Sequence, residues 1–335
     1  MSEYILYGLN IPATLIFDSS VKLLYYFTHQ LILQGEIMPQ SHSPNHIGTS
    51  IANEAKDVPH ARAPQIEARL FVFSDGFVYA ASAVSSAQTS RHAGVVLISL
   101  DDTPIHVSFA DPRTDKPQNI FGRVIALAPG IKRSIQVGAG GVLSIHFDPS
   151  HPVYFPMSEC LASSGGKTIP YRHFRHIEAD IHECRHARNE DIARNIFEKC
   201  AQAITKLCPQ TAIRDQRIVE LLGELQSLSP LDYKFAKILE TYNLSASRFS
   251  HLFTANAGLS LRSFLQWQKI KEAIAMFETG ISMTEIAHAS GFSDSAHFCR
   301  TFNKCLGLKP SMFGPGCPVN VQVMDSALEG KSAYA

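Results

Sequence analysis

The C-terminal half of the chain contains one short pattern twice, and this repeat constrains the fold more than any other feature. The copies are ILETYNLSASRFSHLF over 238–253 and IAHASGFSDSAHFCRTF over 286–302. Each has an apolar helix end, a residue suited to a left-handed turn (Asn243 or Gly291), a Leu or Phe, a capping residue and a second helix. The sequence therefore predicts a helix, a tight turn and a helix, written twice.

In both copies the second helix has an apolar stripe and a polar face. Ser245 and Asp294 are placed to cap these helices. The residues predicted to point inward are Phe249, Leu252 and Phe253 in the first copy, and Phe298, Thr301 and Phe302 in the second. The residues predicted to point outward are Ala246, Ser247, Ser250 and His251 in the first copy, and Ser295, Ala296, Cys299 and Arg300 in the second. Mostly short outward side chains permit close approach to a groove of DNA.

A predicted helix, SLRSFLQWQKIKEAIAMFETG, joins the two copies and is ended by Gly280. Its predicted buried stripe consists of Leu261, Phe264, Leu265, Ile270, Ala273, Ile274 and Phe277. About 18 helical residues give a rod of roughly 27 Å. Such a rod suits two helices that enter successive major grooves, about 34 Å apart on one face of DNA. The alternative is a plain helical bundle in which the repeat reflects only packing.

The segment from about Ile213 to Phe313 resembles the DNA-binding domain of the AraC/XylS family of bacterial transcription regulators. GFSDSAHFCRTFNKCLGLKPSMF is similar to that family's signature. The resemblance implies a sequence-specific regulator that reads two adjacent major-groove segments of double-stranded promoter DNA, without enzymatic activity or a cofactor. The implied DNA-binding residues are Ser247, Arg248, Ser250, His251, Ser295, Ala296, Cys299 and Arg300.

Three positions depart from the family pattern. His251 stands where Arg or Lys is usual, Lys269 stands where the connecting helix usually has Arg, and Gly314 follows Phe313 where Arg is common. We therefore expect the contacts of the first helix to be weaker, and mildly pH-sensitive because histidine titrates near neutrality.

From Ala68 the sequence changes to short β-rich runs separated by turn residues. The runs are RLFVFSD, GFVYAASAV, GVVLISL, IHVSFA, RVIALAP, RSIQVG and GVLSIHFD. Seven or more short strands at this spacing, with no helix between them, predict an antiparallel sandwich or barrel. The predicted fold class is α+β and multidomain, with an N-terminal antiparallel β domain followed by an all-α double helix-turn-helix domain.

The stretch from Ala68 to Val153 resembles the cupin-like sensor domain found ahead of this DNA-binding domain, which implies control by a small-molecule effector. A cupin metal site needs a His-x-His pair, but here Gly94 stands two residues after His92, and Arg133 stands where related sensors often carry His. We therefore expect no metal site. His92 and Arg133 either bind an anionic group of an effector or are surface residues on loops. A metal-dependent cupin enzyme with a helical appendage remains the alternative function.

A second group of polar residues lies in YRHFRHIEADIHECRHARNED. His182 and His186 are four residues apart, a spacing that suits a metal ion if the stretch is helical. The alternating charges are equally typical of a solvated linker helix.

The composition shifts predict five segments. Residues 1–65 form a partly disordered N-terminal extension, with Met38 as an alternative start that would make 1–37 an upstream extension. Residues 66–160 form the sensor domain, 161–212 a helical linker with a role in dimerisation, 213–313 the DNA-binding domain and 314–335 a disordered tail. The expected partners are promoter DNA, RNA polymerase if the chain is an activator, a small-molecule effector and a second copy of the chain.

The overall charge excludes a protein that binds DNA through bulk charge. Thirty Lys and Arg balance thirty Asp and Glu, but the segment from Leu231 to Phe313 has a surplus of basic residues, so affinity should depend on groove fit. Seven cysteines without a CxxC pair indicate reduced thiols. Neither N-terminal apolar run reaches the ~20 residues that span a bilayer. The sequence predicts a cytoplasmic protein without membrane contact.

Overall fold

A computed structural model of the chain describes residues 4–6, 9–11, 68–82, 84–138, 140–186, 190–209, 214–229, 233–314 and 317–324. The chain divides into two compact units, Met1–Ala61 and Arg62–Ala335. In the first unit, β1 (Tyr4–Leu6) pairs antiparallel with β2 (Leu9–Ile11). The predictions for the rest of 1–65, including the alternative start at Met38, lie outside the described residues.

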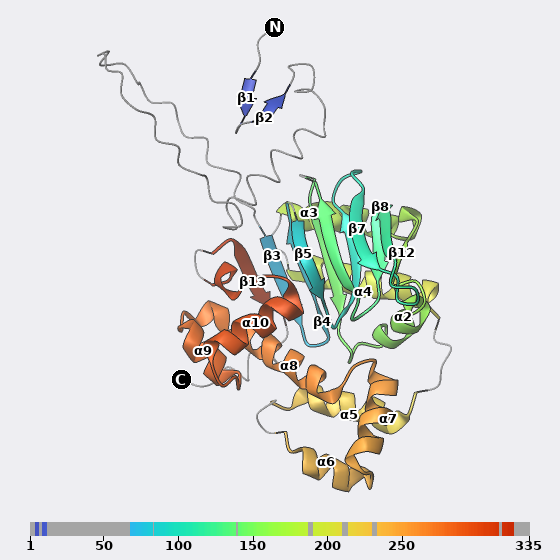
Figure 1. Cartoon of the computed structure of the whole chain (residues 1–335), viewed down its shortest axis with the longest axis vertical. Coiled ribbons are helices and arrows are strands. Elements are labelled where there is room, and N and C mark those ends of the chain that lie inside the picture. Colours follow the sequence, from blue (N-terminus) through green and yellow to red (C-terminus); the bar gives the residue numbers. More distant parts are fainter. Residues whose placement is uncertain are drawn as a thin grey trace, which may run out of the picture. The chain divides into compact units, whose positions relative to one another are not determined.

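The second unit begins with two β-sheets (Figure 1). The strands are β3 (Ala68–Phe73), β4 (Gly76–Ala81), β5 (Val84–Ser90), β6 (Gly94–Ser99), β7 (Ile105–Ala110), β8 (Pro117–Gly122), β9 (Val124–Leu127), β10 (Lys132–Val137), β11 (Val142–Phe147), β12 (Gly166–Thr168) and β13 (Val319–Val323). One sheet has the order β5-β10-β7-β8 and the other the order β12-β9-β6-β11-β4-β3-β13. All pairs are antiparallel except β13 with β3.

An apolar core lies between the two sheets. Its residues come from the seven-stranded sheet, for example Val95 and Ile125, and from the four-stranded sheet, for example Val107 and Ile135. The strand β7 shows how a strand contributes one face to this core, since every second residue is buried. The predicted α+β fold class, with a β-rich N-terminal part and a helical C-terminal part, is confirmed.

Helices cover the outer face of the seven-stranded sheet. They are α2 (Tyr154–Leu161), α3 (Glu178–His186) and α4 (Glu190–Leu207), with short turns η2 (Tyr171–His173) and η3 (Arg175–Ile177) before α3. Ile181, Cys184 and Ile196 are buried against this sheet. The histidine-rich stretch is therefore not simply a solvated linker helix, because Ile181 and Cys184 of α3 belong to the core. β12 joins the sheet, and α3 and α4 complete its core.

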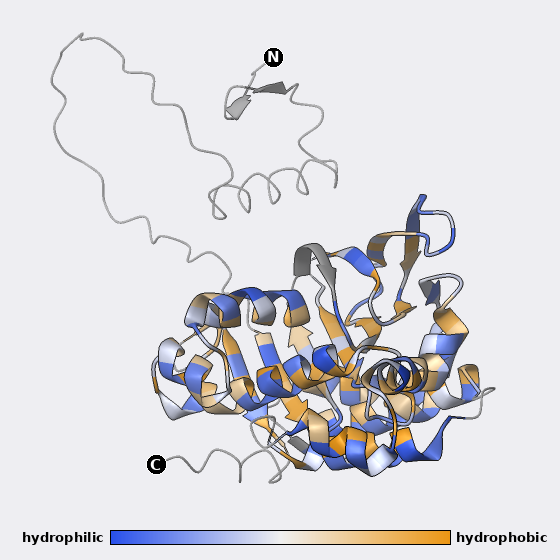
Figure 2. Ribbon diagram, turned by 60° about the horizontal axis from the view of Figure 1, so that its bottom comes forward, coloured by the Kyte–Doolittle hydropathy of each residue, from blue (hydrophilic) through white to orange (hydrophobic). Residues whose placement is uncertain are grey.

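The remaining helices form the C-terminal half. They are α5 (Gln216–Ser227), α6 (Phe235–Tyr242), α7 (Ala246–Ala257), α8 (Leu261–Met276), α9 (Met283–Ala289) and α10 (Ser295–Leu306), with η4 (Phe277–Thr279) and η5 (Pro310–Met312). The start of α8 shares an apolar core with α5, α6 and α7. The rest of α8 shares another core with α9, α10 and the strands β3, β4 and β13. Figure 2 shows apolar residues gathered on the strands and polar residues on the outer sides of many helices.

The strand β13 corrects the prediction of a disordered tail over 314–335. Val319 and Val321 are buried, and β13 pairs parallel with β3, from Val319 opposite Ala68 to Val323 opposite Val72. The five-residue segment VNVQV alternates apolar and polar residues, but it finds its partner about 250 positions earlier in the chain. Residues 325–335 lie outside the described residues.

Candidate nucleic-acid interface

The first helix-turn-helix unit consists of α6 and α7. Asn243 has a φ of 49°, in the left-handed region that the sequence predicts for the turn. The amide of Leu244 donates to the carbonyl of Leu239 at 3.3 Å, which closes the end of α6. The side chain of Ser245 accepts from the amide of Arg248 and caps α7. These local bonds fix how α7 leaves the turn.

The second helix-turn-helix unit consists of α9 and α10 and repeats this arrangement. A capping box between Ser282 and Glu285 starts α9. Gly291 has a φ of 79°, again as predicted, and the amide of Phe292 donates to the carbonyl of Ala287 at 2.8 Å. Asp294 accepts from the amide of His297 at 2.6 Å and caps α10.

Lys269 of α8 contacts the turn between α9 and α10. Its Nζ donates to the carbonyl of Gly291 at 2.6 Å and lies 5.7 Å from the centre of the Phe292 ring. The position where the family pattern usually has Arg is therefore occupied by a residue that holds the turn ahead of α10.

The predicted inward stripes are buried, apart from one partly buried residue. Phe249, Phe253, Phe298 and Phe302 are 0% exposed, and Thr301 is 9% exposed. Leu252 is partly buried and packs against the core shared by α5, α6, α7 and the start of α8. Each second helix is thus fixed in rotation about its own axis, because the aromatic stripe permits one orientation.

The predicted DNA-binding residues lie on the opposite, outer sides of α7 and α10. Ser247, Arg248, Ser250, His251, Ala296 and Arg300 are exposed, and Ser295 and Cys299 are half-buried. Cys299 also packs against the core that α8 shares with α9, α10 and the strands β3, β4 and β13. The structure brings the first four together on α7 and the others together on α10.

The helix α8 is more buried than the sequence indicates. The predicted stripe is buried or half-buried, but Trp267, Gln268, Lys271 and Glu272 are buried as well. The burial of Lys271 and Glu272 is unexpected from the sequence, because Lys and Glu are typical of a solvated helix face.

Lys271 joins α8 to the sheets. Its Nζ lies 2.8 Å from Oδ2 of Asp148, just after β11, and donates to the carbonyl of Ser74 at 2.6 Å. Gln226 of α5 donates to the same carbonyl at 2.6 Å. Burial raises the pKa of Asp148 above its usual range, and the charge of Lys271 opposes that shift. The helix α8, which connects the two helix-turn-helix units, is therefore fastened to the β domain by a buried ion pair.

The two predicted effector residues have different surroundings. Arg133 lies in β10 and is 0% exposed, so its alternative interpretation as a surface loop residue is wrong. His92 is half-buried in the turn between β5 and β6, and burial followed by the charge of Lys304 lowers its pKa. Sequence reasoning missed two buried residues near Arg133, namely Arg91 and His146.

The histidine-rich stretch forms η2, η3 and α3. Cys184 is buried and His182 is exposed, whereas the side chain of His186 lies outside the described residues. Within the part of the chain that the structure describes, no three His, Cys, Asp or Glu residues are grouped as they would be to hold a metal ion. None of the helices among these described residues is long and apolar enough to cross a membrane.

Known proteins are similar to this chain mainly in its helical half. A family model described as "Helix-turn-helix domain" matches residues 238–314. The arabinose operon regulatory protein of Escherichia coli (strain K12) is 34% identical over 109 residues, which cover 32% of this chain and 37% of that protein. The uncharacterized regulator YijO of the same strain is 28% identical over 111 residues, 31% of this chain and 38% of that protein. The chain thus spans little more than a third of the length of these relatives.

Solved structures similar to the chain include ToxT from Vibrio cholerae. One such structure covers 70% of this chain and 95% of ToxT, with 16% sequence identity and a TM-score of 0.44.

Proposed function

We propose that the chain is a sequence-specific DNA-binding transcription regulator of the AraC/XylS type, because residues 238–314 match a helix-turn-helix family model and the arabinose operon regulatory protein is 34% identical over 109 residues. In this proposal α7 and α10 are recognition helices that enter two adjacent major-groove segments of promoter DNA. The protein has no enzymatic role in this account and works in the cytoplasm.

One observation carries the proposal. Two helix-turn-helix units with the same turn geometry and the same capping each hold a helix by a buried aromatic stripe and expose its opposite side. A bundle that served packing alone would need no matched outer faces of mostly short residues ending in a long donor. His251 and Arg300 are those donors, and short neighbours such as Ser247 and Ala296 let the helix backbone approach the bases.

The β domain is the sensor in this proposal. It receives a small-molecule signal, and a second copy of the chain assembles with it as a homodimer. RNA polymerase is a further partner if the regulator activates transcription. The basic residues at the helix ends position the protein on phosphates, while the outer faces of α7 and α10 read bases.

Replacing Arg300 with Ala is expected to weaken binding by about 1 to 3 kcal/mol and to relax the preference at one base pair. The reason is that an exposed arginine in the middle of α10 is placed for a bidentate contact with guanine. Gel-shift titration on the preferred site, and on sites changed at one base pair each, measures both effects.

Arg113→Ala is the matched control, because Arg113 is an exposed arginine in the loop between β7 and β8 and outside the proposed interface. It should leave every affinity unchanged. Equal weakening of Arg300→Ala on all sites would make Arg300 a phosphate contact. Sequence-independent binding by the unmodified protein that is insensitive to salt would contradict the proposed function.

A further inference from the structure

Two arginines are buried where the two sheets meet. Arg133 of β10, in the four-stranded sheet, is 0% exposed, and Arg91, directly after β5 of the same sheet, is 6% exposed. His146 of β11 is 0% exposed, and its Nε2 lies 3.3 Å from Nη1 of Arg91 and 2.7 Å from Oγ of Ser144. The cluster therefore draws on both sheets.

The contacts of His146 define its tautomer. A guanidinium nitrogen can only donate, so Nε2 of His146 accepts from Arg91, and the ring proton lies on Nδ1. Burial, followed by the charges of Arg91 and Arg133, lowers the pKa of His146 well below its usual range, so the ring is neutral at neutral pH. His146 thus presents Nδ1–H as a donor.

Four buried donors in this cluster have no acceptor in the part of the chain that the structure describes. They are Nε of Arg91, Nε and Nη2 of Arg133, and Nδ1 of His146. Nη1 of Arg133 makes only a long bond, at 3.4 Å, to the carbonyl of Ile131. Buried donors are almost always satisfied in proteins, so four in one place indicate a missing acceptor.

The two guanidinium groups also lack a counter-charge. Burial, followed in Arg133 by the charge of Arg91, lowers the pKa of Arg133 to about 9, and burial lowers that of Arg91 to about 10. Both groups therefore remain cations at neutral pH. Among the described residues, only Tyr79 opposes the shift at Arg91, but burial raises the pKa of its phenol to about 12, so Tyr79 is uncharged at neutral pH. No acid of the described residues opposes the shift at Arg133.

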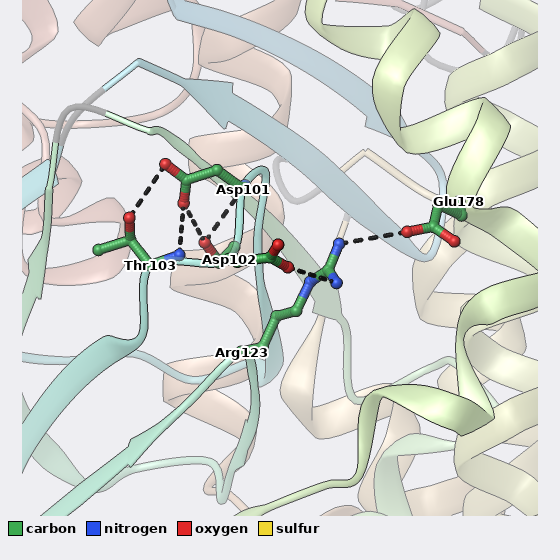
Figure 3. A network of polar contacts seen from close by, with 6 residues as sticks. Asp101, Asp102, Thr103, Arg123 and Glu178 are labelled. Carbon is green, nitrogen blue, oxygen red and sulfur yellow. Dashed lines mark hydrogen bonds and ion pairs between the residues drawn. The ribbon is translucent and has the colours of Figure 1, made fainter.

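Arg123 of the same domain provides a contrast, because it is paired with acids. It lies between β8 and β9, and its guanidinium contacts Asp102 at 2.8 Å and Glu178 at 3.4 Å (Figure 3). It also lies 3.4 Å from the centre of the Tyr171 ring. An arginine that is 25% exposed thus has two carboxylates, whereas the more deeply buried Arg91 and Arg133 share none.

We propose that Arg91, Arg133 and His146 bind a small dianion, such as hydrogen phosphate or a dicarboxylate, between the two sheets. A guanidinium group matches a carboxylate or phosphate with two parallel hydrogen bonds. Two cations beside a neutral imidazole are balanced by two negative charges, which favours a dianion over a monoanion. The absent acceptor and the absent counter-charge are then supplied by one ligand.

The site lies next to the helical half. The ring of Phe77 stacks on His146 at 3.9 Å, and the same ring lies 5.8 Å from the Trp267 ring of α8. A dianion beside His146 is thus two ring contacts from the helix that joins the recognition helices. As the signal of the β domain, a role that rests on the proposed function, the dianion would change DNA affinity through α8.

Thermal unfolding of the full chain without DNA tests the site. At constant ionic strength, phosphate or succinate in place of chloride is expected to raise the Tm by about 3 to 6 °C at saturation, and acetate by less. Whether phosphate or succinate acts at the lower concentration distinguishes a phosphate ligand from a dicarboxylate.

Arg133→Met is expected to abolish this response and to leave the Tm in chloride unchanged or higher, because an unpaired buried cation is replaced by an apolar side chain of similar length. Arg91→Met should also lose the response, while Arg113→Met at an exposed position keeps it. Equal shifts in the unmodified protein and in Arg133→Met would reveal a general salt effect and overturn the proposal. So would the absence of any shift in the unmodified protein. Since this assay contains no DNA, its failure leaves the gel-shift result, and with it the proposed function, standing.

Discussion

Lys271→Ala is expected to lower the free energy of unfolding by about 3 to 5 kcal/mol, because it leaves a buried carboxylate without its cation. Lys271 and Asp148 are 1% and 0% exposed at the side chain and lie 2.8 Å apart. The same substitution frees the carbonyl of Ser74 from one of its donors. Urea denaturation at neutral pH, followed by fluorescence of Trp267 and by circular dichroism, measures the loss.

The loss should depend on pH. Burial already raises the pKa of Asp148, and removal of Lys271 raises it further. A carboxyl with a raised pKa in the folded state favours folding most below its ordinary value of 3.8, and this contribution is lost as the pH rises. The deficit of Lys271→Ala is therefore expected to be smallest near pH 4 and to grow toward neutral pH.

Two variants make the cause of the loss identifiable. Lys199→Ala breaks an ion pair with Asp180 whose side chains are 34% and 22% exposed, so it should cost less than about 1 kcal/mol. The double substitution of Lys271→Met with Asp148→Leu should recover most of the stability, because it removes both buried charges. A Lys271→Ala deficit as small as that of Lys199→Ala would show that the pair does not fasten α8 to the sheets.

Deletion of residues 315–335 is expected to cost about 3 to 6 kcal/mol, from the burial of two valines at about 1.5 to 3 kcal/mol each. Val319 is 0% and Val321 is 4% exposed, and both belong to the core shared by α8, α9, α10 and the seven-stranded sheet. Beyond β13, the amide of Met324 donates to the carbonyl of Val72, and Arg194 of α4 donates to the carbonyl of Met324. Without β13, β3 becomes an edge strand, and we expect aggregation as well.

Deletion of residues 325–335 alone is the control, because it leaves β13 whole. The pair of Val321→Asn and Asn320→Ser makes the same comparison by substitution, since Val321 is buried and Asn320 is half-buried. Thermal unfolding and light scattering report stability and aggregation. Equal melting of both deletions would mean that β13 contributes nothing to the folded protein.

The sequence predicts the helix-turn-helix units well because their signals are local. Asn243 and Gly291 adopt the left-handed turn, Ser245 and Asp294 cap the next helices, and the aromatic stripes are buried. Each of these features depends on residues within about one helical turn. Most strands of the β domain follow, for the same reason, from short β-rich runs bounded by turn residues.

Features that depend on distant partners escape the sequence. The strand β13 pairs with β3, and Lys271 pairs with Asp148 more than a hundred residues earlier, where periodicity gives no signal. The strand β8 is largely exposed, so its PQNIFG text shows no apolar alternation. Arg91 and His146 join Arg133 only when the two sheets meet, and their isolated positions in the sequence indicate no site.

Selection of binding sites by the full chain from a pool of random duplex DNA tests the central claim most directly. The proposal that α7 and α10 are recognition helices joined by α8 predicts enriched sites with two short motifs, about 10 to 10.5 base pairs apart from centre to centre. Changes in α10, such as Arg300→Ala, should relax one motif, and Ser250→Ala with His251→Ala in α7 should relax the other. Inserting five base pairs between the motifs turns them to opposite faces of the duplex and should abolish specific binding. Enrichment of a single motif, or full affinity after the insertion, would contradict a regulator that reads DNA with both helices.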